Sequence, residues 1–173
     1  GLPWSSFCLS GTAMQFAGEW RIFKNMDQQM VSVSRVIKAS PEAIFDVLAD
    51  PARHADIDGS GMVQKVRGDG TRLELGTKFG MAIKMGPVPH KISSNVVEFE
   101  ENELIAWAHF GKHRWRYELE ATEVDGVPAT NVTETFDWST ARLPKAIELA
   151  GYPKKHPVNM EATLGLLAAL FEA

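Results

Sequence analysis

The chain has 173 residues, of which 45% are apolar and 23% are charged. This length suits one domain, and the composition is that of a globular protein rather than of a disordered chain or a coiled coil. The formal net charge of −4 disfavours nucleic acid as a partner, because phosphate contacts require an excess of positive charge.

Three absences bear on the compartment. No apolar run approaches the roughly eighteen residues of a membrane-spanning helix, so we expect no stable membrane insertion. The single cysteine, Cys8, excludes an intramolecular disulfide. The N-terminal segment lacks a basic stretch followed by a continuous apolar core, so a secretory signal is not expected. Together these features favour a cytoplasmic location.

Residues 1–28 differ in character from the rest, with small residues and no clear period. One interpretation is a leader foreign to the protein, with Met26 as the native start. The other is an N-terminal extension in which Gln15 to Phe23 docks as an extra strand or short helix. Both stay open, so we divide the chain into residues 1–28, a leader or extension, and a domain of residues 29–173.

The domain opens with a strand followed by short helices. Residues 30–39 alternate apolar and polar side chains, which is typical of a strand. Ser40-Pro41-Glu42 then supplies a capping hydroxyl, a proline at the first helical position and an acid in the first turn, and predicts a short helix. A second helical turn is expected through His54 to Ile57.

The middle of the chain consists of strand-length segments separated by turn residues. Asp125-Gly126 is a hairpin signal between the last two segments. Consecutive strands joined by short turns pair antiparallel, so we expect one antiparallel sheet of about seven strands. The six segments after the first strand are Met62–Arg67, Thr77–Met85, His90–Glu100, Leu104–Phe110, His113–Thr122 and Ala129–Trp138.

The C-terminal part predicts two helices. The first covers Ala141 to Ala150, and Pro153 and Pro157 are interpreted as breakers after it. The second is a long helix with Asn159 as its N-cap. Its apolar side carries Met160, Leu164, Leu167 and Phe171, widened by Leu166 and Leu170.

These elements predict an α+β fold in which a curved antiparallel sheet wraps around the long C-terminal helix. A sheet with one apolar face needs a cover, and the terminal helix is the element that can provide it. A hollow between the two is the kind of space that holds a small apolar molecule.

Four stretches resemble the START-like or SRPBCC superfamily, and within it the bacterial polyketide cyclase/dehydrase-like group. They are VSVSRVIKASPEAIFDVLADPARHADID, HRWRYELEATEVDG, TNVTETFDWS and EATLGLLAALFE. The resemblance covers about Gln29 to the end and implies a helix-grip fold with a deep cavity for lipids, sterols or polyketides. It does not imply one activity, because members include carriers, sensors and ring-closing enzymes.

The inward faces of the strands and of the terminal helix supply candidate ligand-binding residues. Methionine adapts to irregular shapes, and tyrosine keeps a polar handle. An ordinary core contains the same residue types, so both interpretations stay open. The candidates are Phe79, Met81, Met85, Trp107, Trp115, Tyr117, Phe136, Trp138, Met160 and Leu164.

Glu134 is the most informative single residue. It alternates with Val132 and Phe136, so we expect it to point inward, where a carboxyl group must be paired or neutral. It is either a structural acid or a pocket acid that orients a ligand or transfers protons. Arg35 is a candidate partner. His109 has the same two interpretations, and if the protein is an enzyme, Glu134 and His109 are the catalytic candidates.

A metal is not expected. Asp56, Asp58 and Ser60 match the start of a calcium loop, but Arg67 stands where the loop needs a glutamate. Adding His54 does not complete a zinc set. We interpret this stretch as a polar loop at the cavity mouth and expect neither metal nor cofactor.

Three functions are compatible with these features. The first is a non-enzymatic protein that binds a small hydrophobic ligand, because no recognisable catalytic set accompanies the apolar face. The second is a cyclase or dehydratase, a lyase-type enzyme acting on a polyketide-like substrate. The third is a protein-interaction or stress module without a small ligand. The sequence also leaves a homodimer open.

Overall fold

The computed structural model describes residues 20–67 and 71–172. Within these ranges the strands form one open antiparallel sheet of eight strands in the order β1-β2-β8-β7-β6-β5-β4-β3. The strands are β1 (Trp20–Asn25), β2 (Met30–Ile37), β3 (Val63–Arg67), β4 (Lys78–Met85), β5 (Val88–Glu100), β6 (Leu104–Ala108), β7 (Arg114–Val124) and β8 (Val127–Asp137).

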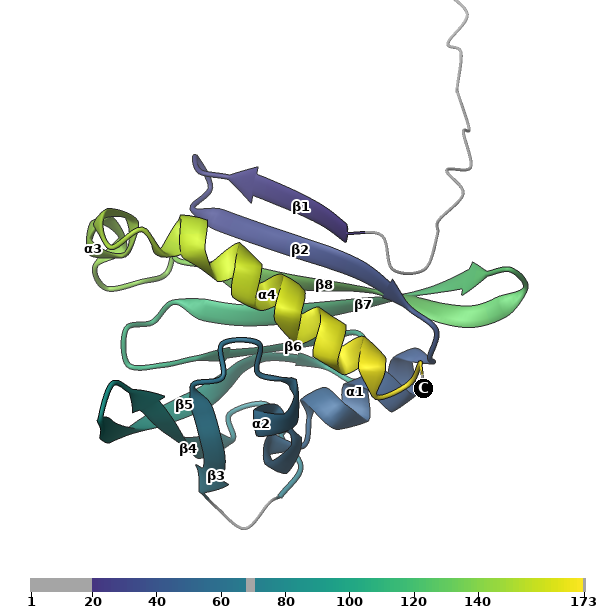
Figure 1. The fold of residues 1–173 in the computed structure, drawn as a ribbon, viewed down its shortest axis with the longest axis horizontal. Coiled ribbons are helices and arrows are strands. Elements are labelled where there is room, and N and C mark those ends of the chain that lie inside the picture. Colours follow the sequence, from purple (N-terminus) through teal and green to yellow (C-terminus); the bar gives the residue numbers. More distant parts are fainter. Residues whose placement is uncertain (1–19, 68–70, 173) are drawn as a thin grey trace, which may run out of the picture.

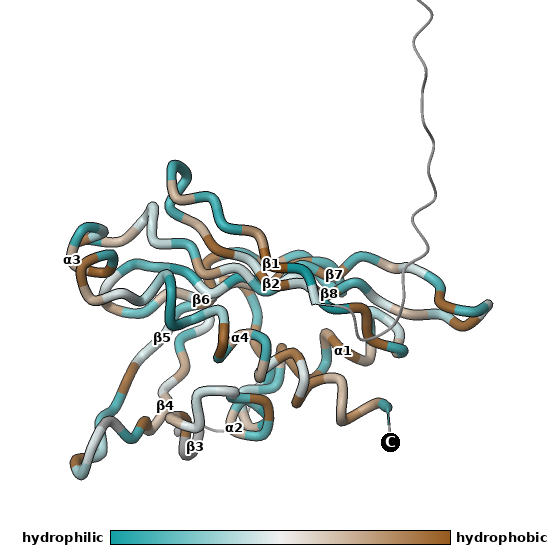
Figure 2. The backbone as a smooth tube through the Cα atoms, turned by 45° about the horizontal axis from the view of Figure 1, so that its top comes forward, coloured by the Kyte–Doolittle hydropathy of each residue, from teal (hydrophilic) through white to brown (hydrophobic). Residues whose placement is uncertain are grey.

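The helices fall into two groups, one after β2 and one after β8. Figure 1 shows α4 running across one face of the sheet, with α3 beside its beginning. The sheet bends from the β1–β2–β8–β7 part towards β3–β5, and α2 and α4 lie on the inner side of the bend (Figure 2). They are α1 (Pro41–Leu48), η1 (Pro51–Arg53), α2 (His54–Ile57), α3 (Pro144–Leu149) and α4 (Tyr152–Ala169).

The predicted start of the first helix is confirmed. The Ser40 hydroxyl accepts a hydrogen bond from the backbone N–H of Ala43 at 3.2 Å, and Pro41 occupies the first turn. This cap satisfies one of the helix's free donors. Ile44, Phe45 and Leu48 are then fully buried.

The prediction of about seven strands is one short of the structure. β1 pairs with β2 along its whole length, from Trp20 opposite Arg35 to Asn25 opposite Met30. This strand therefore extends the sheet at the edge next to β2. Residues 1–19, which include Cys8, lie outside the described part of the chain.

The predicted start of the long helix is wrong. α4 begins at Tyr152, directly after Gly151, whose φ of 76° ends the preceding helix. Pro153 lies in the first turn, where the missing N–H has no helical partner to lose. Pro157 lies inside the helix with its ring buried, so packing offsets the backbone hydrogen bond that it cannot make. Asn159 is consequently a mid-helix residue rather than a cap.

The 18 residues of α4 span about 27 Å and cover β2 and β8. Met160, Leu164 and Leu167 are fully buried in the core, as predicted. Leu166 and Leu170, predicted to widen the apolar side, are instead 42% and 39% exposed.

A long helix held against the inner face of an open, bent sheet is the helix-grip arrangement, and the predicted α+β fold is confirmed. In the part of the chain that the structure describes, no helix combines the length and apolar character needed to cross a bilayer.

Candidate functional site

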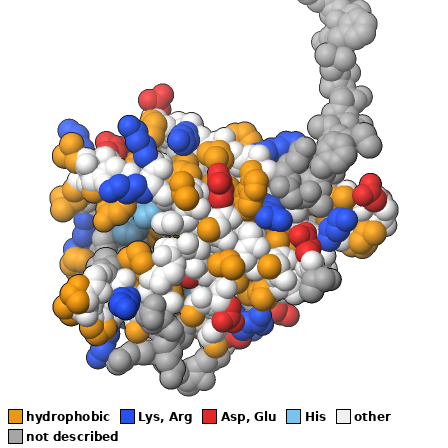
Figure 3. Space-filling model, in the orientation of Figure 1, with side chains coloured by type: hydrophobic (Ala, Val, Ile, Leu, Met, Phe, Trp, Pro, Cys, Tyr) orange, Lys and Arg blue, Asp and Glu red, His pale blue; other side chains and the backbone are white. Residues whose placement is uncertain are grey.

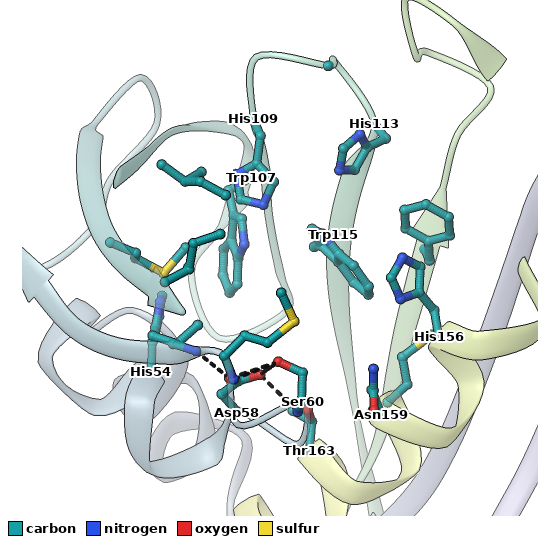
Figure 4. A pocket seen from close by; sticks show the side chains of 18 of the residues that line it. His54, Asp58, Ser60, Trp107, His109, His113, Trp115, His156, Asn159 and Thr163 are labelled. Carbon is teal, nitrogen blue, oxygen red and sulfur yellow. Dashed lines mark hydrogen bonds between the residues drawn. The ribbon is translucent and has the colours of Figure 1, made fainter. Parts of the chain in front are cut away.

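A cavity of about 590 Å³ lies between the inner face of the sheet, α2 and α4. Its wall includes residues of α2, of the loop after it, of β4 to β8 and of α4, and Figure 4 shows several of them around the space. Pockets for small organic molecules typically measure about 300–1,000 Å³. The space beneath the helix is therefore large enough for such a guest.

Aromatic rings from three neighbouring strands form one side of the cavity. Trp107 of β6 is directly opposite Trp115 of β7, and Trp115 is directly opposite Phe136 of β8. The ring centroids of Trp115 and Phe136 are 4.8 Å apart. Residues that face each other across antiparallel strands share one side of the sheet. Figure 4 shows the two tryptophans facing the same space.

Glu134 and Tyr117 form a buried polar pair in this apolar wall. They are opposite each other on β8 and β7, two register pairs beyond Trp115 and Phe136 and therefore on the same face of the sheet. The Tyr117 hydroxyl donates a hydrogen bond of 2.9 Å to Glu134 Oε1. Glu134 Oε2 is buried and has no hydrogen-bond partner among the described residues. Both side chains line the cavity.

The pKa of Glu134 is raised to about 8, chiefly by burial; the hydrogen bond from Tyr117 opposes this rise, and the charge of Asp58 adds to it. Here the loss of hydration destabilises the ionised carboxylate more than the single hydrogen bond from Tyr117 stabilises it. At neutral pH Glu134 is accordingly mostly a neutral acid.

Both carboxylate oxygens of Asp58, in the same cavity wall, accept hydrogen bonds. Its Oδ2 accepts a hydrogen bond from the backbone N–H of Val63 at 2.7 Å, and its Oδ1 accepts one from the Ser60 hydroxyl at 2.7 Å. These bonds fasten the loop after α2. Asp58 is thus a structural anion that also adds negative potential near Glu134.

Three histidines gather at another part of the cavity wall. His109 and His113 flank the β6–β7 turn, and His156 comes from α4 (Figure 4). The ring of His156 lies between those of Phe136, at 4.5 Å, and Tyr152, at 5.0 Å. On the face drawn in Figure 3, histidine atoms are visible in a hollow near α3.

These histidines are neutral at pH 7. The pKa of both His109 and His156 is lowered to about 4, chiefly by burial and also by the nearby His113. Burial also lowers the pKa of His113. His109 Nδ1 is hydrogen-bonded to the Ser94 hydroxyl, whereas His113 Nδ1 is buried without a partner among the described residues.

The helical turn predicted from His54 to Ile57 is confirmed as α2, so His54 is not part of the polar loop that we also expected for this stretch. It begins α2, is buried, and its Nε2 lies 2.8 Å from the Leu48 carbonyl oxygen. Its ring stacks on Trp107 with centroids 4.8 Å apart. His54 lines the cavity from α2. No group of three or more His, Cys, Asp or Glu in the described ranges is arranged to hold a metal ion.

The structure brings most of the predicted site residues to one cavity. Glu134 and His109 line it. So do six of the predicted ligand-binding residues, namely Met81, Trp107, Trp115, Tyr117, Phe136 and Met160.

Four predicted ligand-binding residues are not placed in the wall. Phe79 packs edge-on against His54 and Trp107, and Trp138 stacks on Phe136 and donates a hydrogen bond to Glu148. Leu164 is fully buried under α4. The side chain of Met85 lies outside the described part of the structure.

Arg35 is not the partner of Glu134. It lies opposite Val132, where its guanidinium contacts Glu172 at 3.7 Å and the ring of Trp20 at 4.8 Å. The hydrogen-bond partner of Glu134 is Tyr117 instead.

Sequence reasoning missed His113 and His156. The alternation that placed Trp115 and Tyr117 inward extends back to His113 without change. His156 lies four residues before Met160, so it shares that side of α4 once the helix is known to begin at Tyr152. Interpreting the two prolines as breakers concealed it.

Comparisons with known proteins agree with the fold. Residues 28–172 match the model of the family described as polyketide cyclase / dehydrase and lipid transport. The uncharacterized protein Rv0088 of Mycobacterium tuberculosis is 38% identical over 142 residues, which are 79% of this chain and 62% of that protein. The chain therefore spans less than two thirds of the length of this curated relative.

Solved structures of similar shape share little sequence. A protein from Rhodobacter sphaeroides has a TM-score of 0.65 at 18% identity and covers 88% of this chain and 97% of its own. Protein Ms6760 from Mycobacterium smegmatis has a TM-score of 0.61 at 14% identity and covers 87% and 95%. At these identities the likeness concerns the fold alone.

Proposed function

This chain belongs to the polyketide cyclase / dehydrase and lipid transport family, and from that premise we propose that it binds a small hydrophobic molecule in the cavity between its sheet and α4. The observation that carries the proposal is the aromatic wall of Trp107, Trp115 and Phe136 around about 590 Å³ of space. An apolar guest would release water from these rings, and the burial of apolar surface would drive binding.

The open interior also bears on the interaction-module hypothesis. That hypothesis requires a core filled by its own side chains, with an apolar patch outside. Here part of the inward faces of β6, β7 and β8, including Trp107, Trp115 and Phe136, borders a cavity rather than another layer of side chains. A small ligand accounts for this space, and a protein partner on the outer surface does not.

Native mass spectrometry of the purified protein, followed by organic extraction, tests the proposal. We expect an apolar molecule to travel with the folded protein and to be lost on denaturation. If none is recovered, equilibrium dialysis against a panel of fatty acids, sterols and aromatic ketones follows. Failure to bind any member of the panel would contradict the proposal.

Two neighbouring residues of α4 provide a matched pair of variants for the same assay. Asn159 lines the cavity, whereas Val158 is 68% exposed and does not line it. Asn159→Trp should place an indole in the space and weaken binding by about tenfold or more. Val158→Trp adds the same ring outside and should leave binding unchanged. Equal effects of the two variants would place the ligand elsewhere.

A second function, proton-transfer catalysis of the cyclase or dehydratase type, is favoured by one observation: a cavity carboxyl group with a pKa of about 8. Such a group can act as a base at slightly alkaline pH. Incubation of 2-acetylnaphthalene in D₂O at pH 8.5 should then exchange its methyl protons faster with the wild type than with Glu134→Gln. Equal exchange rates, at concentrations where both proteins bind the ketone, would leave only the binding function.

A further inference from the structure

The inference concerns the chemistry of the ligand and rests on the proposed function. We propose that the ligand carries a hydrogen-bond-accepting oxygen of the carbonyl class on a flat unsaturated body, and that Glu134 Oε2 donates the hydrogen bond to it. Glu134 is then the residue that selects among apolar molecules of similar size.

The first support is the unsatisfied oxygen. Glu134 is 3% exposed, and its Oε1 is occupied by the hydroxyl hydrogen of Tyr117. Its Oε2 makes no hydrogen bond to any described residue, although the side chain borders the cavity. A buried polar atom without a partner is unfavourable, and such atoms in native sites commonly await water or a ligand.

The second support is the direction of the missing hydrogen bond. Tyr117 is a neutral phenol, because burial raises its pKa well above 10, so its hydroxyl keeps the hydrogen that it donates to Oε1. With Glu134 protonated at neutral pH, its proton belongs on Oε2, the oxygen that receives no hydrogen bond. The unpaired group of this cavity-lining side chain is therefore a donor, and it requires an acceptor.

The third support is the surroundings of this donor. Trp115 and Phe136 lie two register pairs away from Tyr117 and Glu134, about 7 Å along the strands. On the other side Trp107 contacts Tyr117 with ring centroids 5.4 Å apart. A ligand whose oxygen reaches Oε2 must therefore lay its body between aromatic rings, where flat π systems pack in offset or edge-on geometry.

A cationic amine is the competing ligand, because aromatic rings and a carboxylate together attract ammonium groups. Such a ligand would need the ionised form of Glu134, which the empty site disfavours at pH 7. The two ligand classes respond oppositely to replacement of Glu134 by glutamine, which keeps a donor but cannot become negative. This difference makes them separable by experiment.

The test is a binding cycle with three probes of similar shape: 2-acetylnaphthalene, 2-isopropylnaphthalene and 1-(2-naphthyl)ethylamine. Each is measured by equilibrium dialysis at pH 6.5 with the wild type, Glu134→Gln and Glu134→Leu. The quantity compared is the ratio of the Kd of the isopropyl probe to that of the acetyl probe, which cancels their common hydrophobic contribution.

We expect this ratio to fall by about tenfold in Glu134→Leu and to stay within about twofold of wild type in Glu134→Gln. At pH 9.5 the ratio should fall in the wild type but not in Glu134→Gln. An unchanged ratio in Glu134→Leu would overturn the inference while leaving ligand binding intact. Preferential binding of the amine, abolished in Glu134→Gln, would also overturn it. If no probe binds to any variant and the panel of ligands fails as well, the proposed function itself is refuted.

Discussion

A single residue pair, Tyr117 and Glu134, concentrates the chemistry of the cavity. Strand alternation predicted that both point inward, and the Asp125-Gly126 turn explains why they meet. In this two-residue hairpin both turn residues have positive φ, and Val124 pairs with Val127. This first pair fixes the register of all the other residue pairs between β7 and β8. Seven residues further along each strand, Tyr117 faces Glu134. Their contact is thus a consequence of the local turn.

We predict that Tyr117→Phe raises the pKa of Glu134 above its wild-type value of about 8. The variant removes the hydrogen bond that favours the ionised carboxylate, while burial remains. A ¹³C NMR titration of the Glu134 carboxyl carbon measures this directly. Tyr152→Phe, at the histidine cluster, is the matched control and should leave the pKa unchanged. Titration of wild-type Glu134 near 4.5 would show that the site is open to water.

At the level of elements, the loop after α2 is clamped to the middle of α4. The backbone N–H of Gly59 donates a hydrogen bond of 2.9 Å to the Thr163 hydroxyl. A Cβ at position 59 would lie 2.3 Å from the Asn159 carbonyl oxygen and 2.5 Å from the Thr163 nitrogen. Only glycine allows this approach, and the contact closes one side of the cavity.

We predict that Gly59→Ala lowers the free energy of unfolding by about 1–3 kcal/mol, because the loop or the helix must move to admit the methyl group. Gly165→Ala is the matched change within α4, where the nearest atom to an added Cβ is 3.7 Å away. Its backbone is helical, so alanine should stabilise the protein by about 0.5–1 kcal/mol. Urea denaturation measures both. Equal effects of the two substitutions would mean that the clamp does not exist in solution.

At the level of the whole molecule, buried titratable groups make stability depend on pH in two directions. Burial lowers the pKa of His54, His109, His113 and His156 from 6.5, and that of His109 and His156 falls to about 4, so in acidic solution the unfolded chain binds more protons at these residues than the folded protein does. Stability therefore rises with pH in this acidic range. Glu134 acts oppositely between pH 4.5 and about 8, where the folded protein keeps a proton that the unfolded chain has lost.

We predict a stability maximum near pH 7. At pH 6.5 each histidine of the unfolded chain is still half protonated, so the four histidines together outweigh Glu134 until about pH 7, and above that pH Glu134 dominates. Between pH 7 and pH 9 Glu134 should contribute a loss of about 1.4 kcal/mol, which the last deprotonation of the histidines partly offsets. The free energy of unfolding from urea denaturation at pH 4.5, 7 and 9 measures it. Glu134→Gln should abolish the decline above pH 7, and a decline that persists in this variant would contradict the assignment.

The sequence predicted the fold better than the site. Regular alternation and turn residues placed the strands from β2 to β8, because those signals are local. Contacts between distant segments were harder to predict from local patterns. Arg35 occupies the same alternating positions of β2 as Val31 and Val33, but only the register between β2 and β8 shows that it lies opposite Val132 rather than Glu134. The proline-containing start of α4 was misjudged for the same reason, since tertiary burial of Pro157 overrides its local effect.

The central claim is that the cavity under α4 accepts a small hydrophobic molecule. Titration of 2-acetylnaphthalene into protein with ¹³C-labelled methionine methyl groups tests it most directly. Met62, Met81 and Met160 line the cavity, whereas Met30 on β2 does not. Ring currents from the bound naphthalene should shift the three cavity methyl signals in a saturable way and leave that of Met30 in place. Saturating probe that leaves all three cavity signals unmoved would contradict the claim.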